Sequence, residues 1–561
     1  MKNIRILLPI LTGMIPITLA CSSDADKADI IFTNGNIYTV DEQFSKASII
    51  AVKGSRILHT GNDIAEAEQW KSPATRIIDL EGRTVIPGII ESHVHFFDLG
   101  TSIAQPDIYE KPKEDILNII SNETRKHKPG EWIVASGWSH EVWPDAQWPT
   151  KEELDAVSPD NPVCLFRKDG HSVWVNSKAL ELAGITDATP DPQGGELIRT
   201  KSGRLTGVLV DTAMDELVAD IPALTPQQRL EIYKLADSDM LRLGITSLVD
   251  AGVSCADIEL LTEAYRNGHL HVRACELLNE GADVEYIASG KLPQRDLFDG
   301  KLSVSGVKLY TDGSLGSRSA WFLHEYEDRH GHLGNSRYSD AEFLDIVRRV
   351  RKNGFQIATH AIGDAAVRQT LDAYEKVLAE EPLADPRYRI EHFQHVQPDD
   401  IVRAAKNGVI ASMQTIHATS DMPFAETRVG PDRILGAYAW RTMLDNGGII
   451  ANGSDAPVEP VNPFFGFYAA ITRQNQQGIP QDGWYPQLCM SREEALKSYT
   501  IWGAYAMFAE TDKGSIEAGK YADFTILDRD IMTCNAADIF NTKVLCTVIG
   551  GQTVFNSESE N

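Results

Sequence analysis

Two histidines near position 94 have the spacing of a metal-ligand pair. His93 and His95 stand two residues apart, directly after the mostly apolar run of residues 85–90. Alternate residues of a β-strand point to the same side, so both imidazoles could reach one metal ion. A lone histidine is more often a satisfied core or surface residue. At this spacing, a ligand pair and two structural histidines are equally good interpretations.

Four further polar residues occupy equivalent places, at or near the ends of other short apolar runs. They are Lys308, His360, His392 and Asp455. Taken alone, Asp455 would be a turn or helix cap. A lysine in an apolar strand is costly to bury without a partner, but carboxylation by carbon dioxide would turn its amine into a metal-bridging anion. Because chance rarely places four histidines, one lysine and one aspartate at equivalent strand ends, the set predicts a metal centre.

The elements that must position these residues alternate between short apolar runs and helical stretches. Eight βα units predict an α/β fold, a closed (β/α)8 TIM-type barrel whose active site lies at the C-terminal ends of its strands. The long gap between the first two strands predicts an insertion at about residues 100–240, with helices expected at 151–157 and 226–243. The eight predicted strands are residues 85–91, 246–250, 271–276, 306–310, 356–360, 388–392, 409–414 and 449–455.

The two ends of the chain share a strand-like alternation of residues. Chain termini commonly lie close together at the surface of a domain. We therefore predict a small β-sandwich domain built from residues 29–86 and 505–561, with residues 87–504 forming the barrel and its insertion. The segments that support this are residues 30–32, 35–40, 48–52, 522–527 and 543–549.

The segment from Val85 to His95 resembles the first-strand signature of the amidohydrolase superfamily, and residues 513–524 resemble the return of those chains to a small β-sandwich. Other segments resemble the YtcJ-like branch, amidohydrolase family 3, which includes N-substituted formamide deformylases. The resemblance covers residues 29–555. One departure is Glu91, where the superfamily often has aspartate; it precedes the ligands and leaves them intact. The matching segments are residues 168–177, 312–318, 360–364, 389–392 and 453–459.

The resemblance implies a site for one or two divalent cations of the zinc type, although Mn²⁺, Fe²⁺ or Co²⁺ also suit such ligands. His93 and His95 would hold one ion, and His360 and His392 the other. Carboxylated Lys308 would bridge them. Asp455 would bind the first ion and move protons, as general base and then as general acid. The implied reaction is hydrolysis of a non-peptide C–N bond, in a linear amide, by metal-activated hydroxide.

Three residues outside this set are candidates for binding the substrate. His171, in the insertion, could lean over the pocket or simply fix the turn after Gly170. Arg318 could clamp an anionic substrate group or form a surface or lid salt bridge. His417 follows the seventh predicted strand and could contact the substrate. Because the insertion leaves the barrel next to the histidine pair, we predict that it forms a lid that decides substrate size.

Two other functions fit the same residues. The barrel equally supports a deaminase, a cyclic-imide hydrolase or an N-acyl amino acid hydrolase, since specificity lies in its loops. A protein of a different class, a non-catalytic surface lipoprotein, would have lost some ligands, and none of the six is missing. The expected partner is a small-molecule substrate. The sequence leaves open whether the chain forms a homo-oligomer.

The first 20 residues resemble a bacterial export signal, with a positive start, an apolar stretch and a cleavage-like end. Cys21 follows directly, as in a lipoprotein box. This predicts lipidation of Cys21, a short linker at residues 21–28, and a periplasmic protein held at the membrane by its lipid anchor only. Simple cleavage after Ala20 is the alternative.

The chain carries 53 basic and 80 acidic residues, a formal net charge of −27. So acidic a surface repels phosphate backbones, and no basic cluster reverses the charge locally, which argues against nucleic-acid binding. The six cysteines beyond Cys21 show no Cys-x-x-Cys spacing. They are therefore predicted as free thiols rather than metal ligands.

Overall fold

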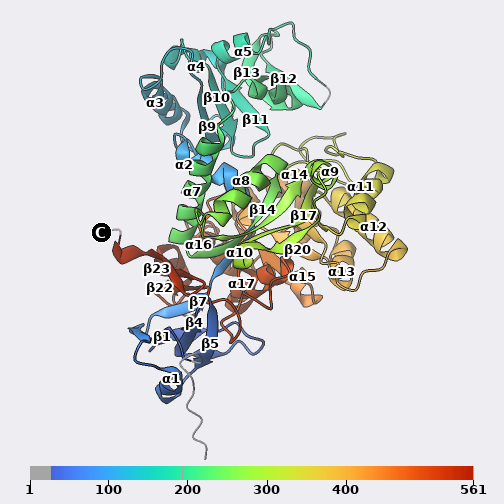
Figure 1. The fold of residues 1–561 in the computed structure, drawn as a ribbon. Helices are drawn as coiled ribbons and strands as arrows, with labels where there is room; N and C mark the ends of the chain where they lie inside the picture. Colours follow the sequence, from blue (N-terminus) through green and yellow to red (C-terminus); the bar gives the residue numbers. More distant parts are fainter. Residues whose placement is uncertain (1–26, 193, 560–561) are drawn as a thin grey trace, which may run out of the picture.

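The computed structural model describes residues 27–559, except residue 193. The predicted export signal at residues 1–20, the lipidation site Cys21 and most of the linker 21–28 lie outside the described residues. Figure 1 shows three parts along the molecule: a small sheet domain at one end, a barrel in the middle and an inserted sheet at the other end. Within the described part of the chain, no helix is both long and apolar enough to cross a membrane.

A (β/α)8 barrel forms the centre of the molecule, as predicted. Its strands run parallel and pair in chain order. Between the last strand and the first, the loop after β21 closes the ring, where the Asp455 N–H donates to the His93 carbonyl at 2.8 Å. The eight strands are β8 (Ile89–Val94), β14 (Ile245–Val253), β15 (Arg273–Asn279), β17 (Leu302–Tyr310), β18 (Gln356–Ala361), β19 (Arg389–His392), β20 (Ile410–Met413) and β21 (Ile450–Asn452).

Helix α11 (Asp340–Lys352) illustrates how the sequence builds the outer layer of the barrel. Ser339 and Glu342 form a capping box, which satisfies backbone N–H groups that the first turn leaves without partners. The buried residues Phe343, Val347 and Val350 recur at helical spacing. This apolar stripe therefore packs onto the barrel, while the charged face meets solvent.

Both ends of the chain build the small domain, which confirms the predicted β-sandwich. One sheet has the strand order β5-β4-β1-β6, and the other β24-β23-β22-β7-β2-β3. Phe32 from the N-terminal segment and Phe524 from the C-terminal one meet edge to face, with ring centroids 5.1 Å apart. The strands are β1 (Ile30–Thr33), β2 (Asn36–Tyr38), β3 (Lys46–Ala47), β4 (Ile49–Lys53), β5 (Arg56–Gly61), β6 (Arg76–Asp79), β7 (Thr84–Pro87), β22 (Phe524–Leu527), β23 (Val544–Ile549) and β24 (Gln552–Asn556).

The prediction of one strand at residues 85–91 is wrong, because that run divides between two domains. Strand β7 pairs with β22 in the sandwich and ends at Pro87, and β8 begins the barrel at Ile89. Gly88 separates them at a point where a Cβ atom would lie 2.1 Å from Thr246 Oγ1. Only glycine allows this close approach. The other seven predicted strands each overlap an observed one.

The insertion after β8 folds as a five-stranded sheet with its own apolar core. It packs helices against the sheet, including α4 (Lys151–Val157), which has the predicted bounds. Trp138 and Trp174 are fully buried in this core. The strands are β9 (Ile133–Trp138), β10 (Val163–Arg167), β11 (Ser172–Val175), β12 (Gly195–Arg199) and β13 (Leu205–Asp211).

Helix α7 (Pro226–Arg242), which we predicted inside the insertion, belongs to the barrel wall. Its residues Tyr233, Ala236 and Met240 join the main core of the barrel. They pack there with α2 (Phe96–Ala104), the helix that follows β8. The inserted unit therefore lies between these two helices and is shorter than the predicted span of about 100–240.

Candidate metal centre

The six predicted ligands meet at the C-terminal ends of the barrel strands. His93 and His360 lie on β8 and β18, and His392 ends β19. The ring centroid of His392 is 4.9 Å from that of His93 and 4.6 Å from that of His360. Five of the six are buried, and only His95 keeps a quarter of its side chain exposed, at 27%. The residues are His93, His95, Lys308, His360, His392 and Asp455.

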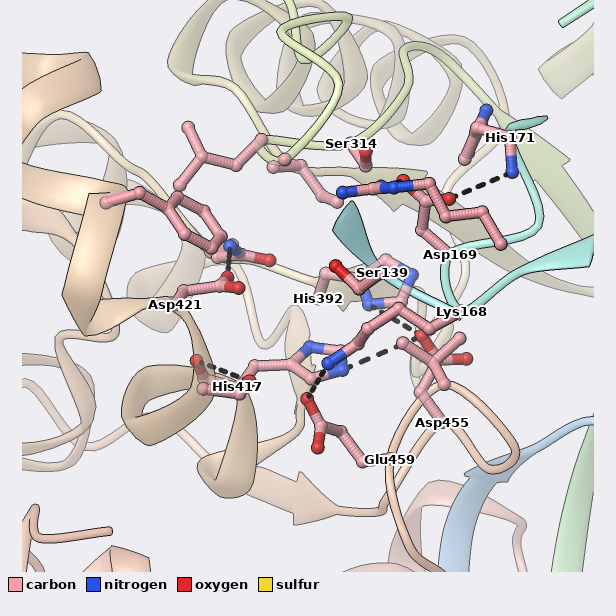
Figure 2. A pocket seen from close by; sticks show the side chains of 18 of the residues that line it. Ser139, Lys168, Asp169, His171, Ser314, His392, His417, Asp421, Asp455 and Glu459 are labelled. Atoms are coloured by element: carbon pink, nitrogen blue, oxygen red, sulfur yellow. Dashed lines mark hydrogen bonds and ion pairs between the residues drawn. The ribbon is translucent and has the colours of Figure 1, made fainter. Parts of the chain in front are cut away.

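Asp455 stands at the middle of this group. Its Oδ1 lies 3.3 Å from His93 Nε2 and 3.2 Å from His95 Nε2. Its Oδ2 lies 3.9 Å from His392 Nδ1 and 3.9 Å from His417 Nε2. Figure 2 shows Asp455, His392 and His417 around the same part of the pocket. Two sets of three donors are therefore close enough for a cation, His93/His95/Asp455 and His392/His417/Asp455.

The donor atoms of these residues fit a divalent cation. Among the described residues, nothing forms a hydrogen bond of normal geometry to Asp455 Oδ1 or to His417 Nε2, although both atoms are buried. Buried polar atoms without partners are rare and costly. Imidazole nitrogens and carboxylate oxygens are ligands that zinc and related ions prefer. A bound cation would satisfy these atoms together.

Two ligands have strained backbones. His392 has φ 72° and Asp455 has φ 61°. The left-handed region disfavours residues that carry a Cβ, at a cost of order 1–3 kcal/mol each. His392 ends β19, and Asp455 lies three residues beyond the end of β21, so both take this conformation where the chain leaves a barrel strand.

Glu391 orients His93. Its Oε2 lies 2.5 Å from His93 Nδ1, so the imidazole turns Nε2 towards Asp455 and Lys308. Arg389 donates to both carboxylate oxygens of Glu391. Burial alone would raise the pKa of Glu391, but the charges of Arg389 and His93 hold it well below its usual range. The carboxylate therefore stays charged and fixes the tautomer of the ligand.

Replacing Glu391 with glutamine is expected to weaken metal binding by about 10–100-fold. Losing the hydrogen-bond partner of a metal-binding histidine typically lowers metal affinity by that factor. The neutral amide holds the imidazole less firmly and leaves the Arg389 charge without its partner. Competition with a chelator of known affinity measures the change. Glu381→Gln, at an exposed residue that ends α12 (Asp364–Glu380), is the matched control. Equal affinity in Glu391→Gln and the parent would contradict this role.

Lys308 has no acidic partner among the described residues. It is 1% exposed, and its Nζ lies 3.4 Å from His93 Nε2. Burial lowers the pKa of its amine. Asp312, four residues further along the chain, is not such a partner: it accepts from the N–H groups of Trp321, Ile362 and Gly363 at 2.8–3.0 Å. The same carboxylate lies 3.4 Å from His360 Nε2.

A cavity of about 580 Å³ opens from the ligands towards the insertion. The inserted sheet contributes Ser139, Lys168 and Asp169 to its wall. Lys168 bonds Glu110 of the insertion at 2.8 Å and lies 3.8 Å from Glu459 of the barrel. The insertion thus stands at the mouth of the barrel, where a lid must lie.

The three predicted substrate contacts differ in where they lie. His171 lines the cavity, and its Nδ1 is 2.9 Å from Asp211 Oδ1. Figure 2 places it across the pocket from His417. His417, in α14 (Thr415–Arg433), belongs to the ligand group itself. Arg318 does not line the cavity; it pairs with Asp328 at 2.7 Å within the loop after β17, and a salt bridge was the alternative role that we gave it.

The sequence comparisons agree with this site. The sequence model described as "Amidohydrolase family" matches residues 76–555. The putative amidohydrolase YtcJ of Bacillus subtilis is 31% identical over 532 residues, covering 94% of this chain and 99% of its own. The N-substituted formamide deformylase of Arthrobacter pascens is 29% identical over 539 residues, covering 93% of this chain and 97% of its own.

Among solved structures, a similar one is an uncharacterized metal-dependent hydrolase from Pyrococcus furiosus. It is 28% identical to this chain, with a TM-score of 0.73, and the match covers 90% of this chain and 100% of the other. The fold is therefore shared with a protein described as a metal-dependent hydrolase.

Proposed function

Because this chain belongs to the amidohydrolase family, we propose that it is a metal-dependent hydrolase that cleaves a non-peptide C–N bond in a linear amide. The observation that carries the proposal is the group of buried imidazole and carboxylate atoms around one space, two of them without hydrogen-bond partners among the described residues. The size of the adjoining cavity, about 580 Å³, suits a small molecule rather than a polymer.

His93, His95 and Asp455 would hold one cation. For a second cation, the resemblance implies His360 with His392, whereas the donor atoms that lie within 4.8 Å of one another are those of His392, His417 and Asp455. Zinc suits these donors, with Mn²⁺, Fe²⁺ and Co²⁺ as alternatives. A cation in this set supplies Lewis-acid chemistry, lowering the pKa of water enough to provide hydroxide near neutral pH and polarising a carbonyl. Carboxylation of Lys308 would supply an anion that joins the two positions.

We infer that Asp455 moves the proton. Its carboxylate faces the cavity between the histidines, with one oxygen that accepts no hydrogen bond of normal geometry. It would accept the proton of the attacking water and deliver it to the leaving nitrogen, as general base and then general acid. His171 and the other residues of the insertion that line the cavity would hold the substrate and exclude water at the mouth of the barrel.

Support for an amide comes from the relative whose name assigns it N-substituted formamides. A deaminase, a cyclic-imide hydrolase and an N-acyl amino acid hydrolase use the same barrel chemistry and are the alternatives within the family. A non-catalytic surface lipoprotein is the alternative outside it. The presence of every predicted ligand around one space favours an enzyme over that last function.

A substrate panel on metal-loaded protein distinguishes these proposals. N-substituted formamides, N-acyl amino acids, amines of nucleobase type and cyclic ureas would be supplied separately, with release of amine, ammonia or carboxylate measured. We expect release of amine or carboxylate from linear amides. Turnover only of cyclic ureas, or release only of ammonia, would replace the amide proposal by one of the alternatives.

We also propose that the chain is exported to the periplasm and lipidated on Cys21. The support is the sequence alone, an Ala20-Cys21 junction after a short apolar stretch. Mass spectrometry of the native N-terminus tests this. We expect a diacylglyceryl-modified Cys21 and extraction only by detergent. An unmodified N-terminus on a protein that needs no detergent would contradict lipidation, and an intact Met1 would contradict export as well.

A further inference from the structure

Helix α14 places an acidic side chain, Asp421, in the cavity, one turn beyond His417. Residues four apart on a helix share one face, and both His417 and Asp421 line the cavity. Figure 2 shows the two on the same side of the pocket. Four residues advance a helix by roughly 6 Å, so Asp421 lies about that far along the helix axis from His417. The proposed mechanism gives this carboxylate no task.

The Asp421 carboxylate has only neutral partners, and they occupy only one of its oxygens. Gln394 Nε2 donates to Oδ2 at 2.8 Å, and the Tyr438 hydroxyl donates to the same atom at 2.6 Å. No described residue donates a hydrogen bond to Oδ1 or forms an ion pair with the carboxylate. The side chain is half-buried and lies against the open volume of the cavity.

Every other carboxylate on the cavity wall, apart from Asp455, has a lysine or arginine partner or accepts hydrogen bonds from backbone N–H groups. Lys168 pairs with Glu110 and Glu459. Arg167 pairs with Asp169 and, together with Arg428, with Glu141. Asp312 accepts backbone N–H groups on both of its oxygens. Within the described residues that line the cavity, Asp421 is thus the one acid outside the metal centre that has neither a lysine or arginine partner nor a backbone N–H donor.

We propose that Asp421 binds a cationic group of the substrate, so that the substrate is an amide carrying an ammonium group a short spacer away from the scissile carbonyl. This rests on the proposed hydrolase function. A carboxylate that is partly removed from water gains most from a charged donor, since such hydrogen bonds are the strong ones. Metal cations nearby would repel an ammonium group elsewhere in the cavity, and a fixed carboxylate offsets that repulsion.

Matched substrates test the proposal without changing the protein. N-formyl-1,4-diaminobutane carries an ammonium group, N-formylpentylamine replaces it with methyl, and N-formyl-4-aminobutanoate reverses the charge. We expect kcat/KM to favour the ammonium substrate over the methyl one by about 10–100-fold, the gain typical of a hydrogen bond to a charged group. The carboxylate substrate should be the poorest. Equal kcat/KM values of the parent enzyme for the ammonium and methyl substrates would overturn the proposal.

Asp421→Asn then assigns the preference to this residue. Its amide oxygen can still accept from Gln394 and Tyr438, while the charge is gone. We expect the ratio of kcat/KM between ammonium and methyl substrates to fall to about one, whereas Asp432→Asn, at an exposed residue beyond the kink at Gly430, keeps the parent ratio. An unchanged ratio in Asp421→Asn would overturn the assignment. If Asp421→Asn does not fold, the ratio of kcat/KM between the ammonium and methyl substrates, measured on the parent enzyme, decides whether the cavity has a cationic subsite.

Direct binding separates this inference from the proposed function. If none of the three amides is hydrolysed, the proposed amide hydrolysis fails, and calorimetry with pentylamine, which is an ammonium ion at neutral pH, and with the neutral 1-pentanol decides the inference by itself. Tighter binding of pentylamine than of 1-pentanol to the metal-loaded parent, lost in Asp421→Asn, would support the cationic subsite. Equal binding of pentylamine and 1-pentanol would overturn it.

Discussion

Replacing Lys308 with alanine is expected to remove most of the bound metal and to lower kcat roughly a thousandfold or more, since Lewis-acid stabilisation is worth several kcal/mol. The reason lies in its surroundings. The side chain is 1% exposed, approaches His93 Nε2 at 3.4 Å and has no acidic partner among the described residues. A free ammonium group there would repel cations and lose its hydration. A carbamate on Lys308 would instead attract them.

Two measurements separate the carbamate from a plain structural amine. Elemental analysis should show less metal in Lys308→Ala than in the parent, and acetate or another short carboxylic acid should restore part of the activity by filling the gap. Lys352→Ala, at the exposed end of α11, should match the parent in both. If Lys308→Ala binds its full complement of metal and shows only a raised KM, then the Lys308 amine of the parent enzyme contacts the substrate and does not form a carbamate.

Asp455→Asn is expected to lower kcat by about 10²–10⁴-fold, the usual contribution of a positioned general acid–base group. Asparagine keeps the size of the side chain but cannot accept a proton at neutral pH. Its oxygen also binds a cation more weakly, so metal content should fall in parallel. The effect is measured as kcat on protein reloaded with saturating metal, which isolates proton transfer from metal loss.

The matched control for this variant is Asp482→Asn, at an exposed position away from the cavity. It should leave kcat and metal content at the parent values. If Asp455→Asn, fully reloaded with metal, turns over at the parent rate, then Asp455 moves no proton, and another group in the cavity must do so. His171, with its Nδ1 held by Asp211, would then be the next residue to replace.

The six candidate ligands could be found from sequence because each stands at or just beyond the end of a recognisable strand. Parallel barrel strands bring such positions together whatever their distance along the chain. His417 was predicted only as a substrate contact, because it lies in the first turn of helix α14, three residues beyond the end of the predicted strand 409–414. The structure puts its Nε2 3.9 Å from Asp455 Oδ2.

The partners of the ligands could not be predicted, since they depend on contacts between distant segments. Glu391 holds His93 across 298 residues, and neither position alone reveals the pairing. A weaker signal was present: Arg389 and Glu391 stand two apart in an apolar strand, so they share one side and can pair there. For Arg318, sequence offered two roles, and only the position of Asp328 distinguishes them.

The boundaries of the first barrel strand and of the insertion were predicted wrongly for a similar reason, because they too depend on contacts between distant segments. Residues 85–91 are apolar throughout except for Glu91, so periodicity could not show that the chain passes from one domain to another at Gly88. Helix α7 was predicted with its bounds nearly right, but its amphipathic pattern does not say which apolar surface it covers.

Metal dependence of amide hydrolysis is the most direct test of the proposed function. The purified protein would be stripped with a chelator, analysed for metal, assayed on N-substituted formamides, and assayed again after stepwise addition of Zn²⁺. We predict one to two ions per chain before stripping, loss of hydrolysis afterwards, and recovery that saturates at the same stoichiometry. Undiminished hydrolysis by protein shown to be free of metal would contradict the metal-dependent mechanism.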